Sequence, residues 1–278
     1  MTYPAITEET AADDSPPPKP RGKPLDITLL VSAITIVALI GLWAFAASLK
    51  LVSPVFLPSP LVVLKSTYGL ITTGFVDSTL AQHTGASLYR IFGALIAAIV
   101  IGVPAGLAIA ISRVGKGILD PIVEFLRPLP PLAYLPLIII WMGIGEASKI
   151  TVIALAMLPP IIISTVSGVK STSKDHINAA RSFGATRWQL LRHVILPSTI
   201  PSILTGVRIA LGAGWSTLVA AELIAASRGL GFMIQSAAQF LVTDIVIAGI
   251  FVIAIIAFLF EILARILERM IAPWAAHR

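Results

Sequence analysis

The chain has 278 residues, of which 56% are hydrophobic and only 12% charged. Soluble domains carry about 25% charged residues, so this composition and the mean hydropathy of +0.93 argue against a soluble enzyme and predict a membrane protein. There is no cysteine, which excludes disulfides, thiolate metal sites and cysteine nucleophiles.

The first 24 residues differ from the rest of the chain. They carry Glu8, Glu9, Asp13 and Asp14, and the proline-rich run Ser15–Pro20 follows. So little apolar surface predicts a disordered tail over residues 1–25, with a proline-rich recognition ligand as the alternative. The acidic start is not typical of a signal peptide. Residues 26–278 are expected to form the transmembrane domain.

Six segments are apolar enough to be membrane helices, each of which needs about 20 residues to cross the hydrocarbon. They are Ile27–Ala47, Ile91–Ser112, Leu132–Ile144, Ile150–Val169, Ile200–Ala226 and Ile245–Leu263. The third is short and reaches full length only by recruiting Ile122–Pro131, which contains Glu124, Arg127 and three prolines. The predicted fold class is therefore an all-α polytopic membrane protein with six transmembrane helices.

The net charge of +6 gives an orientation for these spans. With the N-terminus inside, fifteen of the 20 Lys and Arg residues fall on inner segments. The five on outer segments are Lys50, Lys65, Arg90, Lys149 and Arg228. This positive-inside bias predicts that both termini are cytoplasmic. Arg90, at the start of the second span, is expected to anchor that helix at the membrane interface.

Prolines and glycines inside the spans suggest kinks and close helix contacts. Pro104, Pro136, Pro159 and Pro160 predict either kinks around an internal path or ordinary kinks. Gly102 and Gly106 form a small-xxx-small pair that permits close helix approach.

Missing motifs exclude several functions. The sequence has no phosphate-binding G-x-x-x-x-G-K-[ST] motif, so this chain does not bind ATP in that way. Its four histidines are scattered, and no metal site is predicted. Almost no ionisable residue lies at the middle of a span, which disfavours an ion-coupled transporter.

The basic, polar segment Ser173–Pro197 separates the fourth and fifth spans. We expect a helix from Lys174 to Phe183, a break at Gly184 and a second helix over Trp188–Val194. Thr186 is the expected N-cap of the second helix, and Leu196-Pro197 is expected to end it. Such a helical hook suits docking into a groove of another protein. The alternative is an amphipathic segment lying on anionic lipid through Arg181, Arg187 and Arg192.

The spacing within this segment resembles the EAA loop of ABC-importer permeases. Asn178-Ala179-Ala180 is followed after three residues by Gly184, and after nine more by Val194-Ile195-Leu196-Pro197. Asn178 stands where the family has Glu, and Val194 where it has the first Ile. The resemblance implies that residues 174–193 form a coupling helix region seated in a cleft of a cytoplasmic ATPase. Asn178 puts one charged contact with that ATPase in doubt.

Other segments are similar to the nitrate, sulfonate and taurine branch of these permeases. They include Arg127–Ala133 and Trp141–Glu146, while Gly214–Ala226 and Arg228–Met233 are most similar to taurine permeases. The similarity covers roughly residues 40–274. It implies a type I ABC importer permease fold with its core at about 80–266, and taurine or a related sulfonate as substrate. The alternative substrate is an alkanesulfonate or a nitrate-type anion. A more distant alternative is that the chain is an ion-coupled secondary transporter.

The resemblance also implies partners. These are a second copy of the permease, two ABC ATPase subunits that hold ATP and Mg, and a periplasmic binding protein. This chain would then be no enzyme, would hold no cofactor or metal, and would lie in the bacterial inner membrane.

Two groups in the fifth span are candidates for solute contact. Small and polar residues there predict either a translocation path or ordinary packing: Gly212, Gly214, Trp215, Ser216 and Thr217. Glu222 and Arg228 lie near its outer end and would complement the ammonium and sulfonate of taurine. They could equally form a salt bridge at the mouth or contact the binding protein.

Overall fold

The computed structural model describes residues 27–50 and 52–274, so the predicted disordered tail lies outside the described residues. The described part is helical, as expected, and its only extended pairing is an isolated bridge between Phe75 and Ser78. The helices, in chain order, are α1 (Ile27–Ser48), α2 (Pro60–Thr72), α3 (Leu80–Ile111), α4 (Arg113–Leu126), α5 (Pro131–Met142), α6 (Glu146–Lys170), α7 (Lys174–Ser182), α8 (Arg187–Leu190), the π-helical turn η1 (Leu191–Ile195), α9 (Leu196–Ala225), α10 (Leu230–Gln239) and α11 (Thr243–Ile271).

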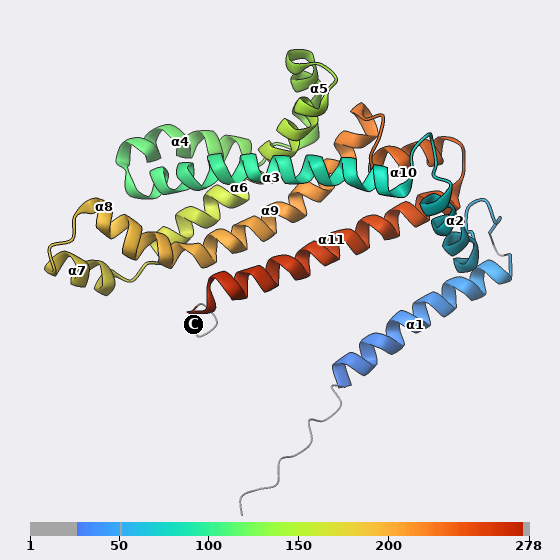
Figure 1. Cartoon of the computed structure of the whole chain (residues 1–278), viewed down its shortest axis with the longest axis horizontal. Coiled ribbons are helices and arrows are strands. Elements are labelled where there is room, and N and C mark those ends of the chain that lie inside the picture. Colours follow the sequence, from blue (N-terminus) through green and yellow to red (C-terminus); the bar gives the residue numbers. More distant parts are fainter. Residues whose placement is uncertain (1–26, 51, 275–278) are drawn as a thin grey trace, which may run out of the picture.

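Five helices among the described residues are long and apolar enough to cross a membrane: α1, α3, α6, α11 and the continuous helix from Arg187 to Ala225 that contains α9. A sixth crossing exists only if α4 and α5, which are bent by 107° at a short break, act together. The long helices run between two ends of the molecule (Figure 1). The helices α7 and α8 lie at one end, and α2 and α10 lie at the other.

The third predicted span is present as two helices joined at a sharp bend. Leu132–Ile144 corresponds to α5, and the recruited stretch Ile122–Pro131 belongs largely to the separate helix α4. Pro128 and Pro130 lie between them, and proline disfavours a helical conformation in the preceding residue and lacks the N–H needed for continuation. The chain therefore turns sharply, and α5 projects to one side of α3, α6 and α9 (Figure 1).

The second helix also extends further than predicted, because α3 begins at Leu80 and not at Ile91. Thr79 caps it with a reciprocal pair of hydrogen bonds to Gln82. Such a capping box satisfies the free N–H groups of the first turn. The added turns carry His83, Ser87 and Arg90, polar residues that are all buried.

The centre of the molecule is α6, which packs against α3 on one side and α9 on the other. Glycines make these contacts close. A Cβ atom on Gly106 of α3 would lie 2.6 Å from the Thr165 Cβ of α6. A Cβ atom on Gly206 of α9 would lie 2.5 Å from the Ser164 Cβ of α6. The small pair Gly102 and Gly106 therefore permits close helix approach, as the sequence predicted.

The remaining helices cover the end opposite α7 and α8. Leu70 of α2, Leu230 and Met233 of α10 and Ala248 of α11 form a second apolar cluster there. The helix α1 is attached at the same end, where the Trp43 indole N–H donates to the Pro58 carbonyl oxygen at 3.1 Å. No residue in the apolar window of α1 is buried, so this helix offers almost its whole surface to lipid or to another chain.

Candidate functional site

The segment between α6 and α9 forms a hook, which we define as residues 174–195. Its turn depends on Gly184, whose φ of +77° is a left-handed conformation that favours glycine. The Gly184 N–H donates to the Arg181 carbonyl at 2.9 Å, and the Ala185 N–H donates to the Ala180 carbonyl at 3.1 Å. Thr186 then caps α8 through a reciprocal pair with Gln189. The predicted break and N-cap are therefore confirmed.

Little of the hook packs against the rest of the chain. The helix α7 has no buried residue, and the side chains of Phe183 and Trp188 are 92% and 67% exposed. Among the predicted coupling residues, Asn178, Ala179 and Gly184 are exposed and Ala180 is half-buried. Exposed aromatic side chains among basic residues at one tip of a protein are suited to contact with a partner.

The end predicted for the second hook helix is wrong. Leu196 and Pro197 do not stop it but begin α9, and the chain remains helical from Arg187 to Ala225. The π-helical turn η1 ends at Ile195, two residues before the proline, and the Leu196 N–H donates to the Leu191 carbonyl. Proline is tolerated in the first turn of a helix, where its missing N–H would have had no α-helical partner. The hook is thus joined to α9 without a break.

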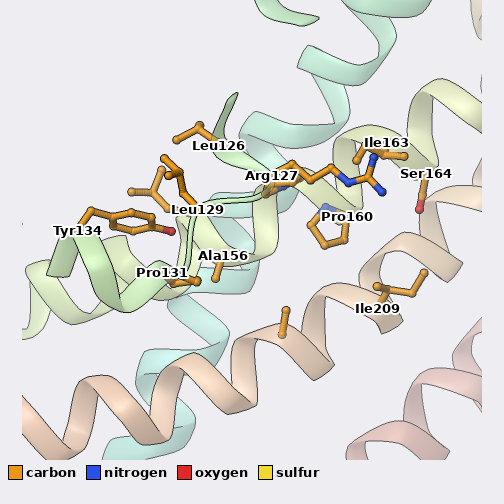
Figure 2. A pocket seen from close by; sticks show the side chains of 13 residues that line it. Leu126, Arg127, Leu129, Pro131, Tyr134, Ala156, Pro160, Ile163, Ser164 and Ile209 are labelled. Atoms are coloured by element: carbon orange, nitrogen blue, oxygen red, sulfur yellow. The ribbon is translucent and has the colours of Figure 1, made fainter. Parts of the chain in front are cut away.

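A cavity of about 440 Å³ lies at the bend between α4 and α5, and we call it the bend cavity (Figure 2). It lies between that bend and the helices α6 and α9. Its wall is mainly apolar and is formed by Leu126, Arg127, Leu129, Pro131, Tyr134, Leu155, Ala156, Pro159, Pro160, Ile163, Ser164, Ile209 and Ala213. The volume lies within the range of about 300–1,000 Å³ that small-molecule sites occupy.

The five predicted path residues of α9 separate into two sets. Gly214, Trp215 and Thr217 are buried: Gly214 lies against Met157 of α6, and the Trp215 ring is 6.1 Å from that of Phe260. Gly212 and Ser216 are exposed and lie on the same face of α9 as Ile209 and Ala213, which line the bend cavity.

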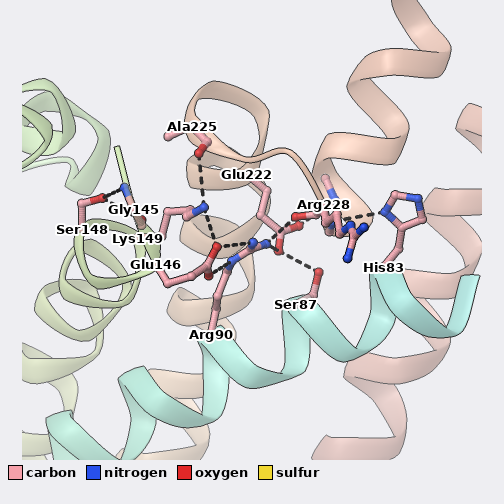
Figure 3. Close-up of polar contacts among 12 residues, drawn as sticks. His83, Ser87, Arg90, Gly145, Glu146, Ser148, Lys149, Glu222, Ala225 and Arg228 are labelled. Atoms are coloured by element: carbon pink, nitrogen blue, oxygen red, sulfur yellow. Dashed lines mark hydrogen bonds and ion pairs between the residues drawn. The ribbon is translucent and has the colours of Figure 1, made fainter. Parts of the chain in front are cut away.

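A buried ionic cluster joins three helices at the end opposite the hook (Figure 3). We call it the Arg90 cluster, and it comprises Ser87, Arg90, Glu146, Lys149 and Glu222. The Arg90 guanidinium donates to Glu222 Oε1 at 2.6 Å and forms a two-pronged contact with Glu146 at 2.6 and 2.8 Å. Lys149 approaches Glu146 to 2.8 Å, so α3, α6 and α9 are connected.

The same cluster fixes the turn between α9 and α10. Glu222 accepts hydrogen bonds from the Ser87 hydroxyl at 2.7 Å and from the Gly231 N–H at 2.8 Å. Arg90 donates to the Arg228 carbonyl at 2.7 Å. Glu222 is fully buried with every oxygen satisfied, so it is one of the structural anchors of this end.

These contacts show how Glu222 and Arg228, the candidate residues of the outer mouth, are arranged. Glu222 pairs with Arg90 and not with the side chain of Arg228, which is exposed and contributes its backbone carbonyl. The expectation that Arg90 anchors a helix at the membrane interface is wrong, because its side chain is only 3% exposed. Arg90 and Glu222 each lie beside a long apolar run, where an unpaired charge is costly, and this position was a signal that each needs a partner.

Comparison with known proteins identifies the class. The family of binding-protein-dependent transport system inner membrane components matches residues 98–273, and the chain belongs to this family. It is therefore a multi-pass inner membrane component of a transport system and not an enzyme.

Individual relatives are similar over nearly the whole chain. The taurine transport system permease protein TauC of Escherichia coli (strain K12) is 55% identical, and the match covers 90% of this chain and 92% of TauC. The putative aliphatic sulfonates transport permease protein SsuC of the same strain is 37% identical, with 86% and 89% covered. The nitrate import permease protein NrtB of Synechocystis sp. is 33% identical, with 92% and 96% covered.

Solved structures support the fold. A chain of the MetNI methionine ABC transporter in an inward-facing conformation superposes with a TM-score of 0.60 at 20% identity, covering 67% of this chain and 93% of that one. A chain of a bacterial alginate ABC transporter gives 0.57 at 15% identity, covering 88% and 96%. The fold is thus that of the type I ABC importer permeases, as the sequence predicted.

Proposed function

We propose that this chain is the membrane-spanning permease subunit of an ATP-driven importer that translocates taurine or a related sulfonate. The observation that carries the proposal is the 55% identity to TauC over 90% of the chain. SsuC, the putative aliphatic sulfonate permease, is also similar along most of its length, which supports a sulfonate as the class of solute. A periplasmic binding protein delivers the solute.

The hook is the surface that receives the ATPase. Asn178, Ala179, Ala180 and Gly184 lie in it, and Leu196 and Pro197 connect it directly to α9. The exposure of α7 and of Phe183 is compatible with docking of the hook into a groove of the ATPase. ATP and Mg are held by two separate ATPase subunits, and this chain holds no cofactor.

The assembly contains two copies of this chain in the bacterial inner membrane, with both termini cytoplasmic. The basic hook would then face the cytoplasm, in agreement with the positive-inside bias. The tail of residues 1–25 would lie on the same side, and the permease core would extend over about residues 80–266.

The translocation path follows the exposed face of α9. Gly212 and Ser216 are its candidates, beside the bend cavity that Ile209 and Ala213 line. The buried positions of Gly214, Trp215 and Thr217 give them a packing role beside the path. Glu222 and Arg228 then shape the mouth through the Arg90 cluster and the α9–α10 turn.

The test is uptake by proteoliposomes that contain this chain, its ATPase and its binding protein. We expect labelled taurine to accumulate only when ATP is supplied to the ATPase side. Liposomes with the permease alone should show no flux, and flux driven by an ion gradient in that sample would indicate a secondary transporter. Competition by unlabelled taurine, an alkanesulfonate or nitrate then ranks the substrates. Failure of every sulfonate to compete would overturn the proposed class.

A further inference from the structure

The bend cavity contains a charge that has no partner in the part of the chain that the structure describes. Arg127 is the only charged residue among those that line it. The described residues supply no ion pair or hydrogen bond to its guanidinium. By contrast, Arg90 contacts Glu222 at 2.6 Å and Arg208 contacts Glu261 at 2.6 Å.

The position of Arg127 is set by the bend. It follows the last residue of α4, and its backbone N–H still donates to the Val123 carbonyl at 2.9 Å. Its side chain extends along the cavity toward Ile163 and Ser164 of α6 (Figure 2). Asp120 and Glu124 line an adjoining, smaller hollow that Arg127 and Ile163 also line, but neither acid forms an ion pair with Arg127.

An unpaired arginine in a mainly apolar cavity has a chemical consequence. Arg127 is an exposed residue, so a solute can reach its guanidinium. Ionisable groups in membrane-spanning segments are rare, and they often mark pathways for solutes or ions. A guanidinium presents a planar fork of N–H donors that matches the oxygens of an oxyanion. The Ser164 hydroxyl and the Tyr134 phenol add hydrogen-bonding groups to the same wall.

We infer that the bend cavity is an anion-recognition site of the permease, in which Arg127 binds the sulfonate of the passing solute and Ser164 and Tyr134 complete its contacts. This inference rests on the proposed import of a sulfonate. Arg127 is thus a specificity-determining residue of the transmembrane path, separate from the selection made by the binding protein.

A thiol-labelling experiment tests the charge preference without any transport. The chain has no cysteine, so Ser164→Cys creates a single thiol in the cavity wall. We compare its rate of modification by two methanethiosulfonate reagents of similar size, one with an ethylsulfonate and one with an ethyltrimethylammonium group. The ratio of anionic to cationic rates should fall about tenfold when Arg127→Gln is added, and Arg127→Lys should keep most of it. Thr72→Cys, an exposed position of α2 at the end opposite the hook, is the matched control, and Arg127→Gln should leave its ratio unchanged.

Protection distinguishes a free solute from a lipid headgroup as the bound anion. Taurine at millimolar concentration should slow the labelling of Ser164→Cys in liposomes of neutral phosphatidylcholine, and Arg127→Gln should abolish that protection. If anionic phosphatidylglycerol slows the labelling and taurine does not, Arg127 binds lipid and the inference is wrong. An unchanged rate ratio in Arg127→Gln also overturns it. Neither result bears on whether the wild-type complex imports taurine, which the uptake assay decides separately.

Discussion

The Arg90 cluster predicts a large loss of stability for Arg90→Met. This change leaves the Glu222 carboxylate, which is fully buried, with only the Ser87 hydroxyl and the Gly231 N–H as partners. Glu146 is affected less, because Lys149 remains 2.8 Å away and the Glu146 side chain is 47% exposed. Removing one partner of a buried ion pair costs about 3–5 kcal/mol, because an uncompensated charge stays behind. We expect a decrease of that size in the free energy of unfolding.

The assay is reversible unfolding of the purified chain in mixed micelles, followed by tryptophan fluorescence. Arg265→Met is the matched control, since Arg265 also contacts a glutamate, Glu261, at 3.0 Å but is 59% exposed. Exposed pairs contribute about 0–1 kcal/mol. The double change Arg90→Met with Glu222→Leu should be less destabilised than Arg90→Met alone, because no buried charge is left unpaired. Equal losses for Arg90→Met and Arg265→Met would refute the reasoning.

Three further predictions concern the hook, the helix contacts and the topology. Gly184→Asp should abolish ATP-dependent uptake while the chain still inserts, because the φ of +77° at residue 184 strains any side chain there. Gly117→Asp, in a helix with open space, should retain uptake, and normal uptake by Gly184→Asp would contradict the coupling role. Gly106→Ala should lower the free energy of unfolding in micelles by about 1–3 kcal/mol through overpacking against α6. Gly85→Ala, with nothing nearby, should cause no loss. A phosphatase or fluorescent reporter fused after Arg278 should report a cytoplasmic position, and a periplasmic signal would contradict the predicted topology.

The long helices were predictable because a helix that crosses the hydrocarbon needs about 20 consecutive apolar residues, and such runs can be recognised in the sequence. The predicted segment Ile150–Val169 lies within α6, Glu146–Lys170, and Ile27–Ala47 agrees closely with α1. The turn at Gly184 and the N-cap at Thr186 were also predicted correctly, because both depend only on residues close by in the sequence. The Leu196-Pro197 boundary was misjudged because a π-helical turn before the proline allows the helix to continue.

The predictions failed where polar residues are satisfied by distant parts of the chain. The second span was predicted to begin at Ile91, but the polar first turns of α3 are satisfied by the Glu222 carboxylate and the backbone of residues 228–231. Arg90 and Glu222 are 132 residues apart, and no local pattern in the sequence pairs them. The bend cavity depends in the same way on residues of α4, α5, α6 and α9 that only the packing brings together.

The packing also indicates which parts of the permease move together. Gly206 of α9 and Gly106 of α3 bring their helices so close to α6 that sliding would force their neighbours apart. The Arg90 cluster ties the same helices at the end opposite the hook. Because the hook continues directly into α9, we expect a displacement of the hook to move α3, α6 and α9 as one body. The helices α4 and α5 bury few side chains, namely Val123 in α4 and Leu135 and Ile138 in α5. The bend cavity lies at the boundary between the two parts, so the pocket around Arg127 is the place where such a movement changes the contacts to a solute.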